Sequence, residues 1–140
     1  MSTILNLSEA VSIALHTMVL LAARNGEVTS NRAIAETLGV SEAHLSKVLQ
    51  RLHRLGLVQS LRGPRGGFAL GRKSDKISLL EVYEAIEGPL KPATCLFRKT
   101  ICSGERCILG DCLKHACRDV KAHFSNTRLA DLAGVFQAGR

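Results

Sequence analysis

All five cysteines of this 140-residue chain lie in one short segment, between residues 95 and 117. They are Cys95, Cys102, Cys107, Cys112 and Cys117, so successive cysteines are separated by six, four, four and four residues. Thiolates are soft ligands that bind zinc or iron–sulfur clusters. Zinc sites normally pair cysteines with about two to four residues between them, whereas wider gaps suit a loop around a cluster whose irons lie apart. The spacing therefore favours an iron–sulfur cluster, with zinc as the alternative.

The N-terminal part of the sequence predicts a compartment in which such thiols stay reduced. Residues 4–23 are largely apolar, but Asn6, Glu9 and His16 interrupt them, which argues against a membrane span. No Lys or Arg precedes Arg24, so the basic region that begins a signal peptide is missing. We therefore expect a cytoplasmic protein without a membrane partner, where disulfides are uncommon and metal ligation explains clustered cysteines better.

Upstream of the cysteines, the sequence predicts a helix-turn-helix motif. A first helix is expected over residues 8–24, a second over 31–38 and a third over 41–55, with Gly39 in the short turn between the last two. In the third helix, leucine and valine side chains repeat at helical spacing and form the predicted buried face: Leu45, Val48, Leu49, Leu52 and Leu55.

The third helix also carries a separate stripe of basic side chains. His44, Lys47, Arg51 and Arg54 repeat at helical spacing, away from the apolar face. Such a stripe can be plain solvated surface. On the second helix of a helix-turn-helix, contact with the DNA major groove is the better explanation.

A β-hairpin is predicted directly after this motif. Residues 57–61 and 67–70 are apolar-rich arms that flank the turn Gly63-Pro64-Arg65-Gly66, and glycine supplies the positive φ angles of a tight turn. A hairpin in this position is the wing of a winged helix. Arg62 and Arg65 lie at its tip, where arginine side chains can enter a narrow minor groove.

Basic residues are concentrated in this part of the chain. The net charge is +7, and between residues 41 and 73 there are seven Lys or Arg against Glu42 alone. Such a concentration is typical of a protein with a polyanionic partner. We therefore predict binding to double-stranded DNA.

Two further helices are predicted beyond the wing. Ser78 and Glu81 form a capping box that begins a short helix ending near Gly88. A last helix begins near Cys112, and its apolar side chains recur along one stripe: Leu113, Ala116, Cys117, Val120 and Phe124. A single apolar stripe on a charged helix needs a partner, and a second copy of the chain would match a palindromic operator.

The expected fold is therefore mainly α, a winged helix-turn-helix with a small β-hairpin wing and a long C-terminal dimerisation helix. Residues 1–76 are predicted to form the DNA-binding domain. Residues 77–111 hold the linking helix and a cysteine-rich cluster-binding loop, and residues 112–140 hold the dimerisation helix and a C-terminal tail.

The order of these elements resembles the IscR/NsrR family of dimeric winged-helix transcriptional regulators, which sense iron–sulfur status, nitric oxide or redox state. The similarity covers nearly the whole chain, and the wing sequence RGPRGGF is its most specific part. It implies that Arg62 enters the minor groove and that Ser46 and Lys47 face bases. The full set of predicted DNA-binding residues is Ser41, His44, Ser46, Lys47, Arg51, Arg62 and Arg65.

The resemblance further implies that three cysteines ahead of the last helix bind a [2Fe–2S] cluster. We predict Cys95, Cys102 and Cys107, because a loop can turn its thiols inward. Cys112 is the alternative third ligand, while Cys117 lies on the apolar stripe and is expected to pack as a small hydrophobe.

The same family often takes a fourth, non-cysteine ligand from the first helix of the partner subunit. In this sequence the candidates are His16 and Glu9. They lie two helical turns apart, roughly 10 Å at the rise of an α-helix, so the two side chains cannot easily share one iron.

The sequence also leaves alternatives to a cluster-sensing regulator. A zinc-stabilised structural or interaction module would place Cys102, Cys107, Cys112 and His115 around the ion, and a cluster-free winged-helix regulator is a further alternative. A redox enzyme is not expected, because the chain has no C-x-x-C motif and no evident partner base. We predict a homodimeric regulator whose affinity for a pseudo-palindromic operator is set by an iron–sulfur cluster.

Overall fold

The computed structural model describes residues 6–93, 95–103 and 107–136. Its elements are α1 (Glu9–Ala23), α2 (Asn31–Leu38), α3 (Glu42–Arg54), β1 (Val58–Leu61), β2 (Gly67–Leu70), the 3-10 turn η1 (Ser74–Lys76), α4 (Leu79–Glu87), α5 (Cys112–Asn126), α6 (Leu129–Leu132) and the 3-10 turn η2 (Ala133–Phe136). This confirms the predicted mainly helical fold with a two-stranded hairpin. None of the helices described here has the length and apolar character that a membrane crossing requires.

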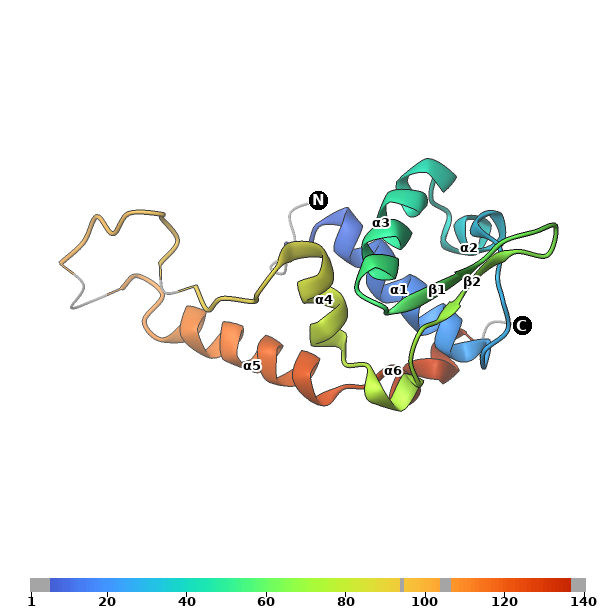
Figure 1. The fold of residues 1–140 in the computed structure, drawn as a ribbon. Coiled ribbons are helices and arrows are strands. Elements are labelled where there is room, and N and C mark those ends of the chain that lie inside the picture. Colours follow the sequence, from blue (N-terminus) through green and yellow to red (C-terminus); the bar gives the residue numbers. More distant parts are fainter. Residues whose placement is uncertain (1–5, 94, 104–106, 137–140) are drawn as a thin grey trace.

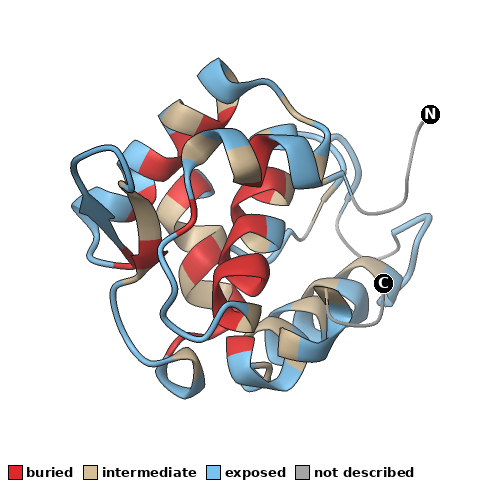
Figure 2. Ribbon diagram, turned by 90° about the vertical axis from the view of Figure 1, so that its right-hand side faces the viewer, coloured by how far each residue is buried: buried red, intermediate tan, exposed pale blue. Residues whose placement is uncertain are grey.

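The core is built around α1. Val11, Ala14, Met18 and Leu21 of this helix are buried, and α4, α6, η2 and α3 all pack against it. Figure 2 shows the buried residues gathered along the central helices, with exposed residues around them. The broad apolar face predicted for residues 8–24 is explained by this central position.

Serine caps set the start of each helix in the DNA-binding part. The Oγ atoms of Ser8, Ser30 and Ser41 accept hydrogen bonds from the backbone N–H three residues later, at 3.2, 3.1 and 3.1 Å. Gly39 ends α2 with a left-handed φ of 67°. These caps place α2 and α3 on either side of the short turn, as the sequence predicted.

The wing contains a pairing that its own sequence did not indicate. β1 and β2 are antiparallel, with Val58 opposite Leu70 and Leu61 opposite Gly67. Thr29, which precedes α2, exchanges two backbone hydrogen bonds with Phe68 of β2, at 2.9 and 2.8 Å. A Cβ atom at Gly67 would lie 2.3 Å from the carbonyl oxygen of Thr29, so only glycine allows this close approach. The wing is thereby fastened to the start of the helix-turn-helix.

The C-terminal segment returns to the core after α5. The N–H of Leu129 donates to the carbonyl oxygen of Ile77 at 3.0 Å, and the N–H of Leu79 donates to that of Thr127 at 3.0 Å. Leu129 and Ile77 are both completely buried. Residues 127–136 therefore belong to the same core as the winged helix.

Figure 1 shows α5 and the preceding loop extending away from the rest of the chain. The C-terminal end of α5 packs on α4, where the rings of Tyr83 and Phe124 lie 6.0 Å apart between centroids. Phe124 thus has a partner within its own chain. Further toward the free end of α5, Leu113, Cys117 and Val120 are half-buried, and no residue of α5 is fully buried.

Candidate nucleic-acid interface and cysteine loop

The exposed face of α3 is defined by the burial of the opposite face. Leu45 and Leu49 are completely buried, which turns Lys47, Gln50 and Arg54 outward into solvent. These three residues are spaced three and four apart, so they form one continuous row. Gln50 is not among the predicted DNA-binding residues, although its spacing from Lys47 and Arg54 already places it in this row.

Three of the predicted DNA-contact residues also hold the N-terminus of α3 in place. Ser41 caps the helix, and Oγ of Ser46 accepts a hydrogen bond from Nδ2 of Asn31 in α2 at 2.7 Å. His44 is half-buried, and its Nδ1 lies 3.8 Å from Oε1 of Glu9 in α1. These contacts hold the N-terminal part of α3 in a fixed orientation relative to α1 and α2.

Arg51 has a partner in α4. Its Nη1 donates a hydrogen bond to the carbonyl oxygen of Ile86 at 2.8 Å, one residue before the end of α4. A charged donor on an otherwise unpaired helix carbonyl is a strong form of hydrogen bond. The side chain therefore joins α3 to the helix that leads into the cysteines.

The different environments of two arginines predict different effects on DNA binding. We expect Arg54→Ala to reduce the slope of log K against log salt by about 1, as loss of one phosphate contact does. Arg51→Ala should leave this slope unchanged, because its guanidinium is bound to Ile86. Binding to a fixed duplex across a salt series measures both slopes. An equal reduction in the two variants would show that Arg51 contacts phosphate.

The wing tip presents two exposed arginines, Arg62 and Arg65. The turn between the strands is closed by a hydrogen bond from the N–H of Gly66 to the carbonyl oxygen of Gly63, at 2.9 Å. At the base of the wing, Nη2 of Arg72 lies 3.2 Å from Oε2 of Glu81 in α4. The helix α4 therefore contacts both α3 and the base of the wing.

The cysteine loop, residues 89–111, has no helix or strand in its described part, 89–93, 95–103 and 107–111. Cys102, Cys107 and Cys112 are exposed, Cys95 and Cys117 are half-buried, and all five are free thiols. Cys112 is the first residue of α5, and Cys117 lies on the apolar stripe of that helix, as predicted. Among the residues that the structure describes, no three Cys, His, Asp or Glu side chains are grouped closely enough to hold a metal ion.

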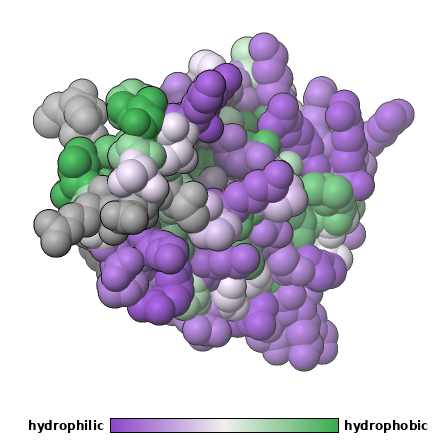
Figure 3. All heavy atoms as spheres, turned by 90° about the vertical axis from the view of Figure 1, so that its left-hand side faces the viewer, coloured by the Kyte–Doolittle hydropathy of each residue, from purple (hydrophilic) through white to green (hydrophobic). Residues whose placement is uncertain are grey.

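The donors of this loop nevertheless fit a soft metal cofactor. Free thiols in a segment without regular structure can turn toward a common centre, and thiolates are the ligands that iron–sulfur clusters require. The loop also exposes large apolar side chains: Leu96, Phe97, Ile101 and Ile108 have exposed fractions of 62, 61, 78 and 91%. Figure 3 shows hydrophobic surface on the side of the molecule that carries this loop. Such a surface is expected to become covered, by a cofactor site or by a second subunit.

Glu9 and His16 lie on the outer side of α1. They line a groove with Ser12, Leu38 and Val40, between α1 and the end of α2. Nδ1 of His16 lies 2.6 Å from the carbonyl oxygen of Ser12, which leaves Nε2 of the ring as the atom able to bind a metal. In the described part of the chain, neither residue belongs to a group of three or more potential metal ligands.

A helix-turn-helix with an outward basic row, followed directly by a hairpin with arginines at its tip, defines a winged-helix protein. A family model for Rrf2, described as an iron-dependent transcriptional regulator, matches residues 7–134. The chain belongs to the Rrf2 family of winged-helix transcriptional regulators, whose members are regulators and not enzymes.

Individual relatives support the same assignment. The chain is 39% identical over 80 residues to the HTH-type transcriptional regulator CymR of Bacillus subtilis, covering 56% of this chain and 58% of that relative. It is 35% identical over 100 residues to NsrR of the same organism, covering 70% and 68%. The solved structure of CymR, the global cysteine regulator of B. subtilis, has a TM-score of 0.77 at 30% identity and covers 94% of this chain and 98% of that one.

Proposed function

We propose that the protein is a homodimeric regulator that binds a pseudo-palindromic DNA operator with an affinity set by a [2Fe–2S] cluster. The observation that carries DNA binding is the outward row of α3 beside a wing with arginines at its tip. Cluster binding is supported by the free thiols of the cysteine loop and by the iron-dependent description of the family.

Each DNA-binding element has a distinct part in this proposal. Lys47 and Gln50 contact base edges in the major groove, where lysine suits guanine and glutamine suits adenine. Arg54 contacts the phosphate backbone, and Arg62 and Arg65 enter the adjacent minor groove. Ser41, His44 and Ser46, at the N-terminus of α3, set the register of the helix and lie nearest to the bases.

Cys95, Cys102 and Cys107 hold the cluster in this proposal, with Cys112 as the alternative to Cys95. The partner subunit's His16 or the partner subunit's Glu9 supplies the remaining ligand. When bound, a [2Fe–2S] cluster supplies a centre that changes charge, or is lost, in response to oxidants, nitric oxide or iron supply.

The helix α4 provides the route from the cysteine loop to the DNA-binding elements. Its C-terminal end leads directly into the loop and is joined to α3 through Arg51 and Ile86. Its N-terminal turn is joined to the base of the wing through Glu81 and Arg72. A shift of α4 that follows ordering of the loop therefore changes the spacing between α3 and the wing, which decides how well the two fit adjacent grooves.

Dimerisation through α5 is testable with two neighbouring substitutions. Val120→Glu places a charge on the half-buried apolar stripe, where it costs several kcal/mol unless it is paired. We expect sedimentation to show monomers for this variant. Lys121→Glu changes charge at an exposed position of the same helix and should remain a dimer. A stable dimer from Val120→Glu would place the interface elsewhere.

DNA binding itself is tested by selection from a randomised duplex pool with the anaerobically purified protein. We expect the bound sequences to share two half-sites related by two-fold symmetry, with centres one helical turn, roughly 34–36 Å, or a multiple of it apart. Recovery of sequences without any common motif would contradict a specific operator.

A further inference from the structure

A cavity of about 530 Å³ lies between the C-terminal end of α1, α2 and η2. Its volume falls within the range of roughly 300–1,000 Å³ that is usual for small-molecule sites. Leu20, Ala23 and Phe136 form its apolar walls. The cavity is open to solvent on one side, and its polar groups come from three exposed residues, Arg24, Glu27 and Thr37. None of these residues belongs to the DNA-binding row, the wing tip or the cysteine loop.

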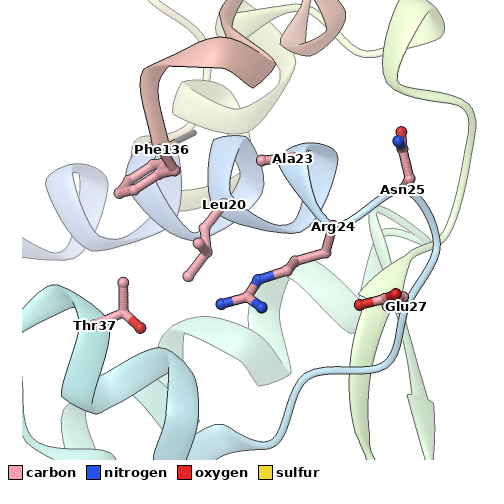
Figure 4. Close-up of a pocket in the computed structure, with 7 residues that line it drawn as sticks. All are labelled: Leu20, Ala23, Arg24, Asn25, Glu27, Thr37 and Phe136. Carbon is pink, nitrogen blue, oxygen red and sulfur yellow. The ribbon is translucent and has the colours of Figure 1, made fainter. Parts of the chain in front are cut away.

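The two charged groups in this cavity do not neutralise each other. Figure 4 shows the Arg24 side chain running into the cavity toward Leu20 and Thr37, with the Glu27 carboxylate turned toward it from the other side. Within the described part of the chain, neither side chain makes a hydrogen bond or an ion pair. A free guanidinium and a free carboxylate thus border one space without touching.

This arrangement discriminates between ligand classes by charge. A simple anion is attracted by Arg24 but repelled by Glu27. A simple cation is attracted by Glu27 but repelled by Arg24. A zwitterion satisfies both, because guanidinium binds carboxylate through paired hydrogen bonds and a carboxylate binds ammonium. The hydroxyl of Thr37 already donates to the carbonyl oxygen of Ala33 at 2.8 Å, so its oxygen can accept a further hydrogen bond from a ligand N–H.

We propose that this cavity binds a free α-amino acid with an apolar side chain. The ligand carboxylate pairs with Arg24, its ammonium group pairs with Glu27, and its side chain packs on Leu20 and Phe136. Because Thr37 lies in α2, the first helix of the helix-turn-helix, a ligand in this cavity borders the DNA-binding motif. The site is separate from the cysteine loop, so ligand binding in this cavity does not depend on cluster binding.

The test is calorimetric titration of the full chain at pH 7 with valine, leucine and methionine. For each amino acid that binds, two matched compounds are also titrated. One is its amide, which lacks the carboxylate, and the other is the corresponding carboxylic acid without the amino group, which lacks the ammonium. We expect both to bind about tenfold more weakly or worse, since each loses one charge-assisted contact. No binding of any of the three amino acids, or equal binding of the matched compounds, overturns the proposal.

Variants assign the binding to this cavity. Arg24→Met and Glu27→Gln should each lose most of the affinity for the amino acid. Arg32→Met is the matched control, because Arg32 is exposed on α2, pairs with Glu36 at 2.9 Å and does not line the cavity. Thermal unfolding checks that each variant is folded. If Arg24→Met is unstable, Glu27→Gln alone tests the assignment. Unchanged affinity in a folded Arg24→Met or Glu27→Gln variant overturns the assignment.

Discussion

Serine at Cys102 or Cys107 should remove the visible absorption of the protein purified without oxygen. These two residues belong to both candidate ligand sets, and both are exposed free thiols. Serine nearly preserves the size of cysteine, but its hydroxyl is a poor ligand for a soft metal centre. We expect loss of most of the absorbance and of the bound iron, measured by ultraviolet–visible spectra and iron analysis.

The remaining cysteines provide the controls for this prediction. Cys117→Ser should retain the spectrum, because Cys117 is half-buried on α5 beside Leu90 and Pro92. Comparing Cys95→Ser with Cys112→Ser identifies the third ligand, which we expect to be Cys95. A normal spectrum in Cys95→Ser together with a lost one in Cys112→Ser would show that the set is Cys102, Cys107 and Cys112. Normal spectra in both Cys102→Ser and Cys107→Ser would exclude the loop as the cluster site.

Arg62→Ala should cause the largest loss of operator affinity among single substitutions in the wing. A side chain that enters the minor groove contributes to specific binding through the strong negative potential there. We expect a cost of about 1–3 kcal/mol, or roughly 5- to 150-fold in Kd. The iron content and the absorption spectrum should not change, because the wing tip lies outside the cysteine loop.

Lys76→Ala is the matched control for Arg62→Ala. It removes the same charge from the exposed turn η1, which packs beside α6 rather than beside α3. Its operator affinity should stay close to that of the natural chain in a fluorescence anisotropy titration at fixed salt. Full affinity in Arg62→Ala would remove the wing from the interface, and an equal loss in both variants would mean that only net charge matters.

The elements that could be predicted from the sequence are those with local signals. The caps of α3 and α4, Gly39 in the turn and the glycine-rich hairpin each depend on residues a few positions apart. Ser30 caps α2, and the backbone of the preceding Thr29 is paired with Phe68 of the wing. That pairing joins distant parts of the chain, so no local pattern could have indicated it.

The tertiary contacts of the candidate site were harder to predict for the same reason. The stripe through His44, Lys47, Arg51 and Arg54 was recognisable from its spacing, but the contacts of His44 with Glu9 and of Arg51 with Ile86 depend on where α1 and α4 pack. The apolar stripe of α5 was also recognisable. The contact of Phe124 with Tyr83 of its own chain could not be predicted, because it depends on how α5 packs on α4.

The central claim is tested most directly by measuring operator affinity and metal content on one anaerobic preparation, before and after the cluster is removed with a chelator. We predict about two irons and two sulfides per chain before treatment. We also predict a change in Kd of about 5- to 150-fold on removal, the usual size of coupling between two sites. Zinc in a colourless protein, or the same Kd with and without the cluster, would contradict a cluster-controlled regulator.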